Sequence, residues 1–122
     1  MPERLAPCPD SPNCVSSDAA DAAHRVAVLT LAMPAEAAWQ QITDTVKSLA
    51  RTTVIQTTGD YLRAECRSAV FRFVDDLELE LRKGEGVVAV RSASRVGYSD
   101  FGVNRRRVEN LRELLRDRGV VK

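Results

Sequence analysis

The chain has 122 residues, which is enough for one hydrophobic core and too few for two. Its hydrophobic fraction of 44% and its charged fraction of 29% are typical of a globular protein and exclude a disordered or membrane-spanning chain. Lys and Arg number 18 and Asp and Glu 17, so the formal net charge is only +1 and no overall positive field favours nucleic acid. We therefore expect no nucleic-acid partner, and any basic site must be local.

The N-terminal segment contains four of the five prolines, which predicts coil over residues 1–23 because proline hinders regular helix and strand pairing. This coil either lies over the domain or is disordered, and residues 24–122 are predicted to form a single α+β domain. The first residues lack the charged and apolar regions of a signal peptide, and no run approaches the ~20 apolar residues that cross a bilayer. The sequence as given therefore predicts a cytoplasmic protein without a transmembrane segment.

Cys8 and Cys14 stand six positions apart, with Pro9 and Pro12 between them. The spacing permits a disulfide, whereas a reducing cytosol would keep both as free thiols, and both states remain open. A structural zinc site needs four ligands, usually in two close pairs, and this chain offers one wide cysteine pair and one histidine. We expect no metal and no other cofactor.

The first half of the domain predicts one strand and one helix. Residues 24–31 are almost wholly apolar and rich in β-branched side chains, which indicates a buried strand. Pro34 suits the first position of a helix of about four turns. The apolar stripe of this helix recurs at three- and four-residue steps: Ala35, Trp39, Ile42, Val46 and Leu49.

Four further strands are predicted over residues 52–57, 61–68, 77–82 and 87–92. In 61–68 and 77–82, apolar residues alternate with charged ones, so each strand has one apolar and one charged face. If these two strands pair, opposite charges become neighbours on the charged face, which carries Arg63, Glu65, Arg67, Glu78, Glu80 and Arg82.

The last helix is expected to begin at Asn104, a capping residue, and to end at Gly119. Its buried stripe would be Val108, Leu111 and Leu115, and three arginines would lie outside: Arg112, Arg116 and Arg118. The order strand, helix, four strands, helix predicts an α+β fold. In this fold an antiparallel sheet of about five strands (β-α-β-β-β-β-α) carries two helices packed on one face.

Two stretches of the sequence are more particular than folding rules require. One is the run CPDSPNCVSS at residues 8–17, and the other is VRSASRVGYSDFGVNRRRVE at residues 90–109. With FRFVDDLE at residues 71–78 between them, they resemble the family catalogued as domain of unknown function 1499, over nearly the whole chain. The resemblance implies a shared fold and an important surface, but no reaction. Family members commonly carry a lipoprotein-like or membrane-anchoring N-terminus, and this sequence departs from that pattern.

We expect any function to lie in the segment 91–107, which contains five arginines. Three of them fall in the first turn of the expected last helix. There each positive charge interacts unfavourably with the helix dipole, which costs roughly 0.3–1 kcal/mol of stability. They are either neutralised within the protein or hold an anion at the helix N-terminus. Both can apply, with Arg95 and Arg105 internal and Arg106 or Arg107 free. The acids available for an internal network are Asp75, Asp76, Asp100 and Glu109.

The leading hypothesis is a non-enzymatic binding or accessory module that holds an anionic small molecule, a lipid headgroup or a protein partner. A second hypothesis is a structural Arg–carboxylate network in a protein-interaction domain. A third is a small enzyme that uses Asp100 with Ser94 or Tyr98. The candidate ligand-binding residues are Arg91, Ser94, Arg95, Tyr98, Asp100, Asn104, Arg105 and Arg106.

No catalytic residue is assigned. His24 is the only histidine and lies in or beside a hydrophobic strand, and no nucleophile-elbow spacing is present for a Ser–His–Asp arrangement. Asp75 and Asp76 are adjacent, so in a strand they would point to opposite faces and could not act as one dyad. Cys66 is expected to be an inert core thiol.

Overall fold

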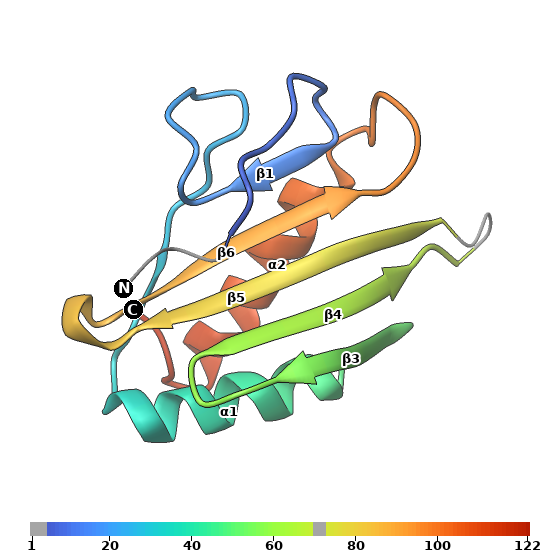
Figure 1. Ribbon diagram of the computed structural model, residues 1–122. Helices are drawn as coiled ribbons and strands as arrows, with labels where there is room; N and C mark the ends of the chain where they lie inside the picture. The colour runs from blue at the N-terminus through green and yellow to red at the C-terminus, as the bar shows by residue number, and fades with distance from the viewer. Residues whose placement is uncertain (1–4, 70–72) are drawn as a thin grey trace.

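The computed structural model describes residues 5–69 and 73–122, which form an antiparallel sheet with two helices on one face (Figure 1). The α+β fold and the element order predicted from the sequence are confirmed, with one additional strand at the start. The helices are α1 (Ala35–Lys47) and α2 (Val103–Asp117), and the short helix η1 (Lys83–Glu85) links the fifth strand to the sixth. Neighbouring strands follow the order β1 (Cys14–Ser16), β6 (Val87–Ser94), β5 (Val74–Arg82), β4 (Tyr61–Arg67) and β3 (Thr52–Thr57), and β2 (Leu29–Thr30) also pairs with β6.

Strand β1 lies inside the segment 1–23 that the sequence predicted to be coil. Its three residues pair antiparallel with the last part of β6, and Cys14 stands opposite Ala93. The last proline of the segment is Pro12, so the backbone N–H groups after it are free to join a sheet. Proline content therefore predicts coil correctly for residues 5–13, but not for the strand that follows Pro12.

The strand predicted over residues 24–31 is correct only for Leu29–Thr30. Upstream of it, the carbonyl groups of Ala27 and Val28 accept hydrogen bonds from the side chain of Arg112, at 2.7 and 2.8 Å. This side chain replaces a neighbouring strand as the hydrogen-bond partner. Arg112 was expected on the outside of the last helix, but it is 8% exposed, because its guanidinium group finds these carbonyls in the interior.

The hydrophobic core lies between the sheet and the two helices, and both predicted helix stripes face it. From the helices it takes Trp39, Ile42 and Val46 of α1 and Val108, Leu111 and Leu115 of α2. The strands contribute chiefly Leu62, Leu77, Leu79, Val88 and Val90. In residues 5–69 and 73–122, no helix has both the length and the apolar character that are needed to cross a bilayer.

The opposite face of the sheet carries charged side chains in register, as the alternation in the sequence predicted. Arg63 of β4 lies opposite Glu78 of β5, and Glu78 lies opposite Arg91 of β6. Opposite charges therefore meet across all three central strands. Of the run FRFVDDLE, residues 71 and 72 lie outside the described residues.

The two edges of the sheet differ. The outer side of β6 is covered by β1 at one end and by β2 at the other. Between them, Ser17 bridges the gap: its N–H donates to the Val90 carbonyl at 2.8 Å, and its Oγ accepts from the Val90 N–H at 2.9 Å. Strand β3 forms the other edge, and its pairing with β4 shifts register between Val54 and Gln56.

Candidate functional site

The sheet divides the five arginines of segment 91–107 into two groups. Arg91 in β6 and Arg95 just after it pair with acids on the charged face of the sheet. Arg105, Arg106 and Arg107 lie in the first two turns of α2, on the face that the helices cover. The five guanidinium groups therefore do not converge on one site.

Arg95 is the centre of an ion-pair cluster on the charged face. Its Nε and Nη2 donate to the two carboxylate oxygens of Asp76 at 2.9 and 2.8 Å, and Nη2 also contacts Glu65 at 2.7 Å. The hydrogen bonds from Arg95 lower the pKa of Asp76 below its ordinary value, although burial opposes the change. Arg91 makes a longer contact with Glu78, at 3.4 Å. Both arginines thus have acids of this chain as partners.

A buried network of hydrogen bonds surrounds Asn104, whose side chain has no exposed surface. Its Nδ2 lies within hydrogen-bond distance of three acceptors: the Asn13 carbonyl at 3.1 Å, the Ser94 hydroxyl at 2.9 Å and Asp100 Oδ2 at 2.8 Å. These contacts join α2, the end of β6 and the segment before β1. One amide thereby connects the two sequence stretches that carry the family resemblance.

The carbonyl side of the same amide accepts hydrogen bonds. The hydroxyl of Ser92 and Nη1 of Arg107 both donate to Asn104 Oδ1 at 2.7 Å. Nη2 of Arg107 then forms an ion pair with Asp75 at 2.8 Å. We call this set of residues the Asn104 hub: Asn13, Asp75, Ser92, Ser94, Asp100, Asn104 and Arg107.

Asp100, and not Asn104, satisfies the first N–H groups at the start of α2. Its Oδ1 accepts from the Gly102 N–H at 2.8 Å, and its Oδ2 accepts from the Asn104 N–H at 3.0 Å. Asn104 was expected to cap the helix, but it lies one residue inside α2 with its side chain turned into the hub. Burial alone would raise the pKa of Asp100, but the hydrogen bonds from Asn104 and Gly102 outweigh it and lower the pKa below its ordinary value.

The turn before α2 holds Phe101 and Gly102 in the left-handed region of backbone conformation, with φ angles of 54° and 80°. Glycine adopts this conformation readily, but for phenylalanine it costs on the order of 1–3 kcal/mol. The Ser99 hydroxyl accepts from the Phe101 N–H at 3.3 Å, and Arg106 donates to the Phe101 carbonyl at 2.9 Å. The turn leaves the Phe101 side chain 86% exposed.

Arg105 and Arg106 bond only to main-chain carbonyls among the described residues. Arg105 donates to the carbonyls of Arg25 and Ala23, at 2.9 and 3.0 Å. Arg106 donates to the Phe101 carbonyl, and no acidic residue stands in the first turn of α2. A carbonyl carries no net charge, so the positive charge of these two arginines is not neutralised by a carboxylate of the described chain.

The open question about the N-terminal cysteines is resolved: Cys8 and Cys14 form a disulfide. Between them, Asn13 donates from Nδ2 to the Gly97 carbonyl at 2.6 Å and offers its own carbonyl to Asn104. The disulfide loop therefore holds Asn13 in place, and Asn13 ties the N-terminal segment to the hub. Cys66 remains a buried free thiol, and burial raises its pKa above the ordinary value.

Loss of the disulfide is expected to lower the free energy of unfolding by about 2 kcal/mol, because the bridge closes a short loop of the unfolded chain. Urea denaturation of Cys8→Ser, and of the wild-type protein with and without dithiothreitol, measures this change. The variant should be insensitive to dithiothreitol. Equal stability of the oxidised and reduced wild-type protein would contradict the expectation.

His24 joins the disulfide loop to the segment that follows β1. Its Nε2 lies 2.9 Å from the Ser11 carbonyl, and its Nδ1 contacts the carboxylate of Asp21. The Ser11 carbonyl and the Asp21 carboxylate raise the pKa of His24 above its ordinary value. Both ring nitrogens are thus engaged in holding two loops together, which gives this histidine a structural role.

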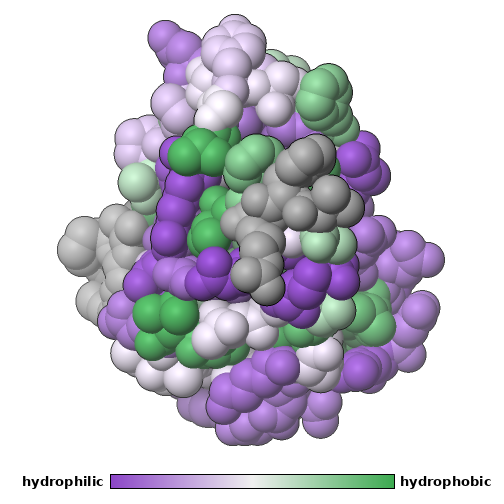
Figure 2. Space-filling view, turned by 90° about the vertical axis from the view of Figure 1, so that its right-hand side faces the viewer, coloured by the Kyte–Doolittle hydropathy of each residue, from purple (hydrophilic) through white to green (hydrophobic). Residues whose placement is uncertain are grey.

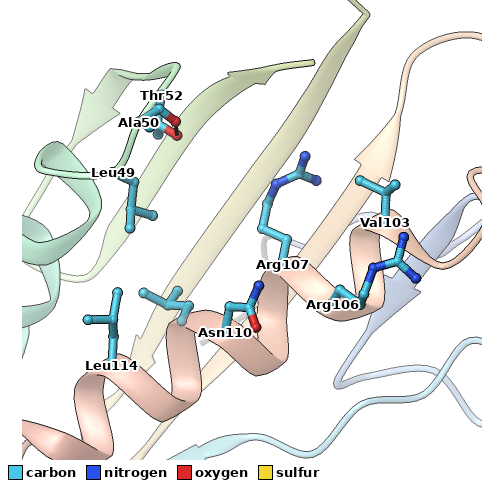
Figure 3. Close-up of a pocket in the computed structure, with 9 residues that line it drawn as sticks. Leu49, Ala50, Thr52, Val103, Arg106, Arg107, Asn110 and Leu114 are labelled. Atoms are coloured by element: carbon cyan, nitrogen blue, oxygen red, sulfur yellow. Dashed lines mark hydrogen bonds between the residues drawn. The ribbon is translucent and has the colours of Figure 1, made fainter. Parts of the chain in front are cut away.

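A groove of about 330 Å³ lies beside the hub, between the end of α1 and the first half of α2 (Figure 3). One wall consists of Leu49 and Ala50, which lie between α1 and β3, and Thr52, the first residue of β3. The other wall is α2, with Arg106 and Val103 at one end and Leu114 toward the other, as the labelled side chains show. Arg107, Asn110 and Leu111 complete the lining. The groove therefore combines apolar walls with two arginines near one end.

The structure places the sequence-predicted residues in different surroundings. Ser94, Asp100 and Asn104 come together in the hub, Arg91 and Arg95 lie on the opposite face, and Tyr98 is 72% exposed. Of the acids expected to pair with the arginines, Asp75 and Asp76 do so, on opposite faces of the sheet. Asp100 bonds to Asn104 and Gly102 instead, and the partner of Glu109 is Arg112.

Sequence reasoning did not assign Asn13 or Ser92 to a site, and it left Arg107 as a residue that could be free, although all three stand in the two signature stretches and Arg107 pairs with Asp75. Their polar side chains beside buried strands were the available signal.

The carboxylate of Asp100 and the hydroxyl of Ser94 accept hydrogen bonds from the same amide of Asn104. Both oxygens of Asp100 also bind backbone N–H groups, and its pKa is lowered. A carboxylate held in this way is a weak general base. Within residues 5–69 and 73–122, no group of His, Cys, Asp and Glu side chains has an arrangement that could hold a metal ion.

A family model described as a protein of unknown function (DUF1499) matches residues 4–115. No curated protein and no solved structure matches the chain. The match includes the disulfide loop, the whole sheet and most of α2, and with them every residue of the hub.

Proposed function

Since the chain belongs to the DUF1499 family, whose description names no activity, we propose a function from the geometry of the groove. The protein is a non-enzymatic binding module that holds a small amphiphilic anion between α1 and α2. The carboxylate or phosphate of this ligand lies against Arg106, and its apolar part lies along the leucines of the groove.

The single observation that supports this proposal best is the state of Arg106. Its side chain is exposed at the groove, and its one hydrogen bond within residues 5–69 and 73–122 is to the uncharged carbonyl of Phe101. It stands in the first turn of α2, where its charge adds to the positive end of the helix dipole. Asp100 already binds the first N–H groups of α2, so an anion at this position would interact chiefly with the guanidinium group.

The apolar lining indicates that the ligand is more than a simple ion. Leu49, Val103, Leu111 and Leu114 line the groove, and Val103 and Leu114 are 40% and 36% exposed. Burying part of this surface would release water from apolar groups at about 25 cal/mol per Å². A ligand with an acidic head and a short hydrocarbon part fits both features.

The five arginines of segment 91–107 have different roles in this proposal, some in the internal network and one in the binding site. Arg91, Arg95 and Arg107 have carboxylate partners, which supports a structural role for these three. Arg105 bonds to two carbonyls of the segment before β2. Arg106 is therefore the residue of segment 91–107 that we assign to ligand binding.

Octanoate is a suitable probe, because it has one carboxylate and a chain short enough for a groove of about 330 Å³. We expect amide chemical-shift changes at Leu49, Val103 and Asn110 in a titration followed by NMR. Arg106→Gln should weaken binding at least about tenfold, since a hydrogen bond to a charged group contributes about 1.5–3 kcal/mol. Arg116→Gln, an exposed arginine in the last turn of the same helix, is the matched control and should bind normally.

Octanol and inorganic phosphate, titrated separately, test the apolar and the anionic part of the ligand. Each alone should bind more weakly than octanoate. Equal octanoate affinity of Arg106→Gln and the wild-type protein, or shift changes confined to another surface, would refute the proposal.

A further inference from the structure

Exposed apolar side chains are concentrated in one projecting loop. The described residues include seven large hydrophobic side chains that are exposed, and four of them fall within positions 96–103. Val96 is 56% exposed, Tyr98 72%, Phe101 86% and Val103 40%. We call these four residues the apolar loop. In Figure 1 the loop stands out beyond the end of β6, next to the N-terminal loops.

Seen from the right-hand side of Figure 1, the molecule shows separate apolar areas among hydrophilic ones (Figure 2). Singly scattered hydrophobic residues are normal on a protein surface, but a local concentration marks an interaction site.

The apolar loop is held in its exposed position by the rest of the site. Asp100 binds the N–H groups of Gly102 and Asn104, and Arg106 binds the Phe101 carbonyl. Upstream, Asn13 binds the Gly97 carbonyl. These contacts keep Phe101 in a left-handed conformation that a phenylalanine would otherwise avoid. A loop without these contacts would be free to turn the Phe101 side chain toward the protein. The contacts therefore hold this side chain in its exposed position.

Positive charge lies at the base of the apolar loop. Arg105 and Arg106 follow it directly and bond only to carbonyl groups among the described residues. The one acid of segment 95–107 is Asp100, and its two oxygens are taken by groups of the same turn. Two exposed aromatic side chains of the loop are therefore followed in the sequence by two arginines that bond only to carbonyl groups among the described residues.

We propose that the apolar loop docks onto the surface of a membrane that contains anionic lipids. Tyr98 and Phe101 enter the headgroup region, where aromatic side chains are favoured, and Arg105 and Arg106 approach the lipid phosphates. The loop projects and is short, whereas a stable protein–protein interface buries upward of about 1,000 Å². Aromatic tips with basic residues behind them fit a lipid interface better than a flat protein partner.

Vesicle flotation with the full chain tests this proposal. The probes are vesicles of phosphatidylcholine alone and vesicles of phosphatidylcholine with one quarter phosphatidylglycerol. We expect the protein to float with the anionic vesicles, to bind much less to the neutral ones, and to dissociate in 0.5 M NaCl. The variant Phe101→Asn with Tyr98→Ser should bind the anionic vesicles at least about tenfold more weakly, because it removes two aromatic side chains from the interface.

Asparagine is chosen at position 101 because it tolerates the left-handed conformation, so the turn is retained. Ile55→Ser is the matched control, since Ile55 is 44% exposed on β3, outside the apolar loop, and it should bind like the wild-type protein.

Three results would overturn the proposal. One is that the wild-type protein binds neither kind of vesicle, and another is that the double variant binds as well as the wild type. The third is that light scattering shows a wild-type dimer and a monomeric double variant, because the loop would then be an interface between copies of this chain. Tyr98 and Phe101 do not line the groove, although Val103 and Arg106 do, so the double variant should lose vesicle binding and keep octanoate binding.

Discussion

Replacement of Asn104 by alanine is expected to lower the free energy of unfolding by about 3–5 kcal/mol, because several buried polar groups lose a partner at once. The carbonyl of Asn13, the hydroxyls of Ser92 and Ser94, and one oxygen of Asp100 all bond to this amide. The amide is fully buried, so these groups have no direct contact with bulk solvent at its position. Urea denaturation followed by circular dichroism measures the change.

Asn110→Ala is the matched control, since Asn110 lies on the same helix and is exposed. Its effect should stay within about 0.5 kcal/mol, the range of ordinary surface substitutions. A similar stability of the two variants would show that the hub does not hold the disulfide loop, β6 and α2 together.

Replacement of Asp75 by alanine is expected to lower the free energy of unfolding by about 3 kcal/mol. Asp75 is 7% exposed and forms an ion pair with Arg107, which also bonds to Ser92 and Asn104. Loss of one partner of a buried ion pair leaves the other charge without compensation in the interior. The side chain of Arg107 reaches the groove and remains 17% exposed, so some water can compensate and the effect falls at the lower end of the usual range.

The adjacent residue provides the control. Asp76→Ala removes one of the two carboxylate partners of Arg95, but on the opposite face of the sheet, where the Arg95 side chain is 43% exposed. An ion pair in contact with water contributes about 1 kcal/mol or less. Two neighbouring aspartates should thus differ by about 2 kcal/mol in thermal or urea denaturation. Equal effects would contradict the separation of the two arginine groups by the sheet.

The sheet and the helices could be predicted because their sequence periods reflect burial directly. In β4, Leu62 and Ala64 alternate with Arg63 and Glu65, and the first pair is buried while the second lies on the charged face. The stripe of α2 recurs at helical spacing and faces the core. A period is a local property, so it can be read without knowledge of the partner element.

Features that depend on distant partners could not be predicted in the same way. Strand β1 has three residues, too few for a period, and it exists because β6 offers an unpaired edge. The buried position of Arg112 depends on two carbonyl groups more than 80 positions away in the sequence. The sequence of α2 alone does not distinguish a buried arginine at this position from a solvent-exposed one.

The sequence drew attention to the segment that contains most of the Asn104 hub but could not show its geometry, and a functional role for residues 91–107 stays a prediction. The signature at residues 90–109 correctly indicated where unusual contacts gather, and Asp75 and Asp76 were correctly placed on opposite faces. The sequence could not show that β6 and α2 place their arginines on different sides of the sheet. It also could not show that Asn104 points inward, because an asparagine near a helix start more commonly caps it.

The edges of the sheet have a consequence for the behaviour of the protein at high concentration. Exposed strand edges are templates on which identical chains can add strands and aggregate. On the β6 side, β1, Ser17 and β2 already occupy the backbone groups that a second molecule would need. On the β3 side, the register shift between Val54 and Gln56 interrupts the regular pairing, and an irregular edge is a poor surface for continuing a ladder. Both edges of the sheet are thus poor sites for the addition of a strand from another molecule. The N-terminal segment covers the β6 edge, and irregular pairing interrupts the β3 edge.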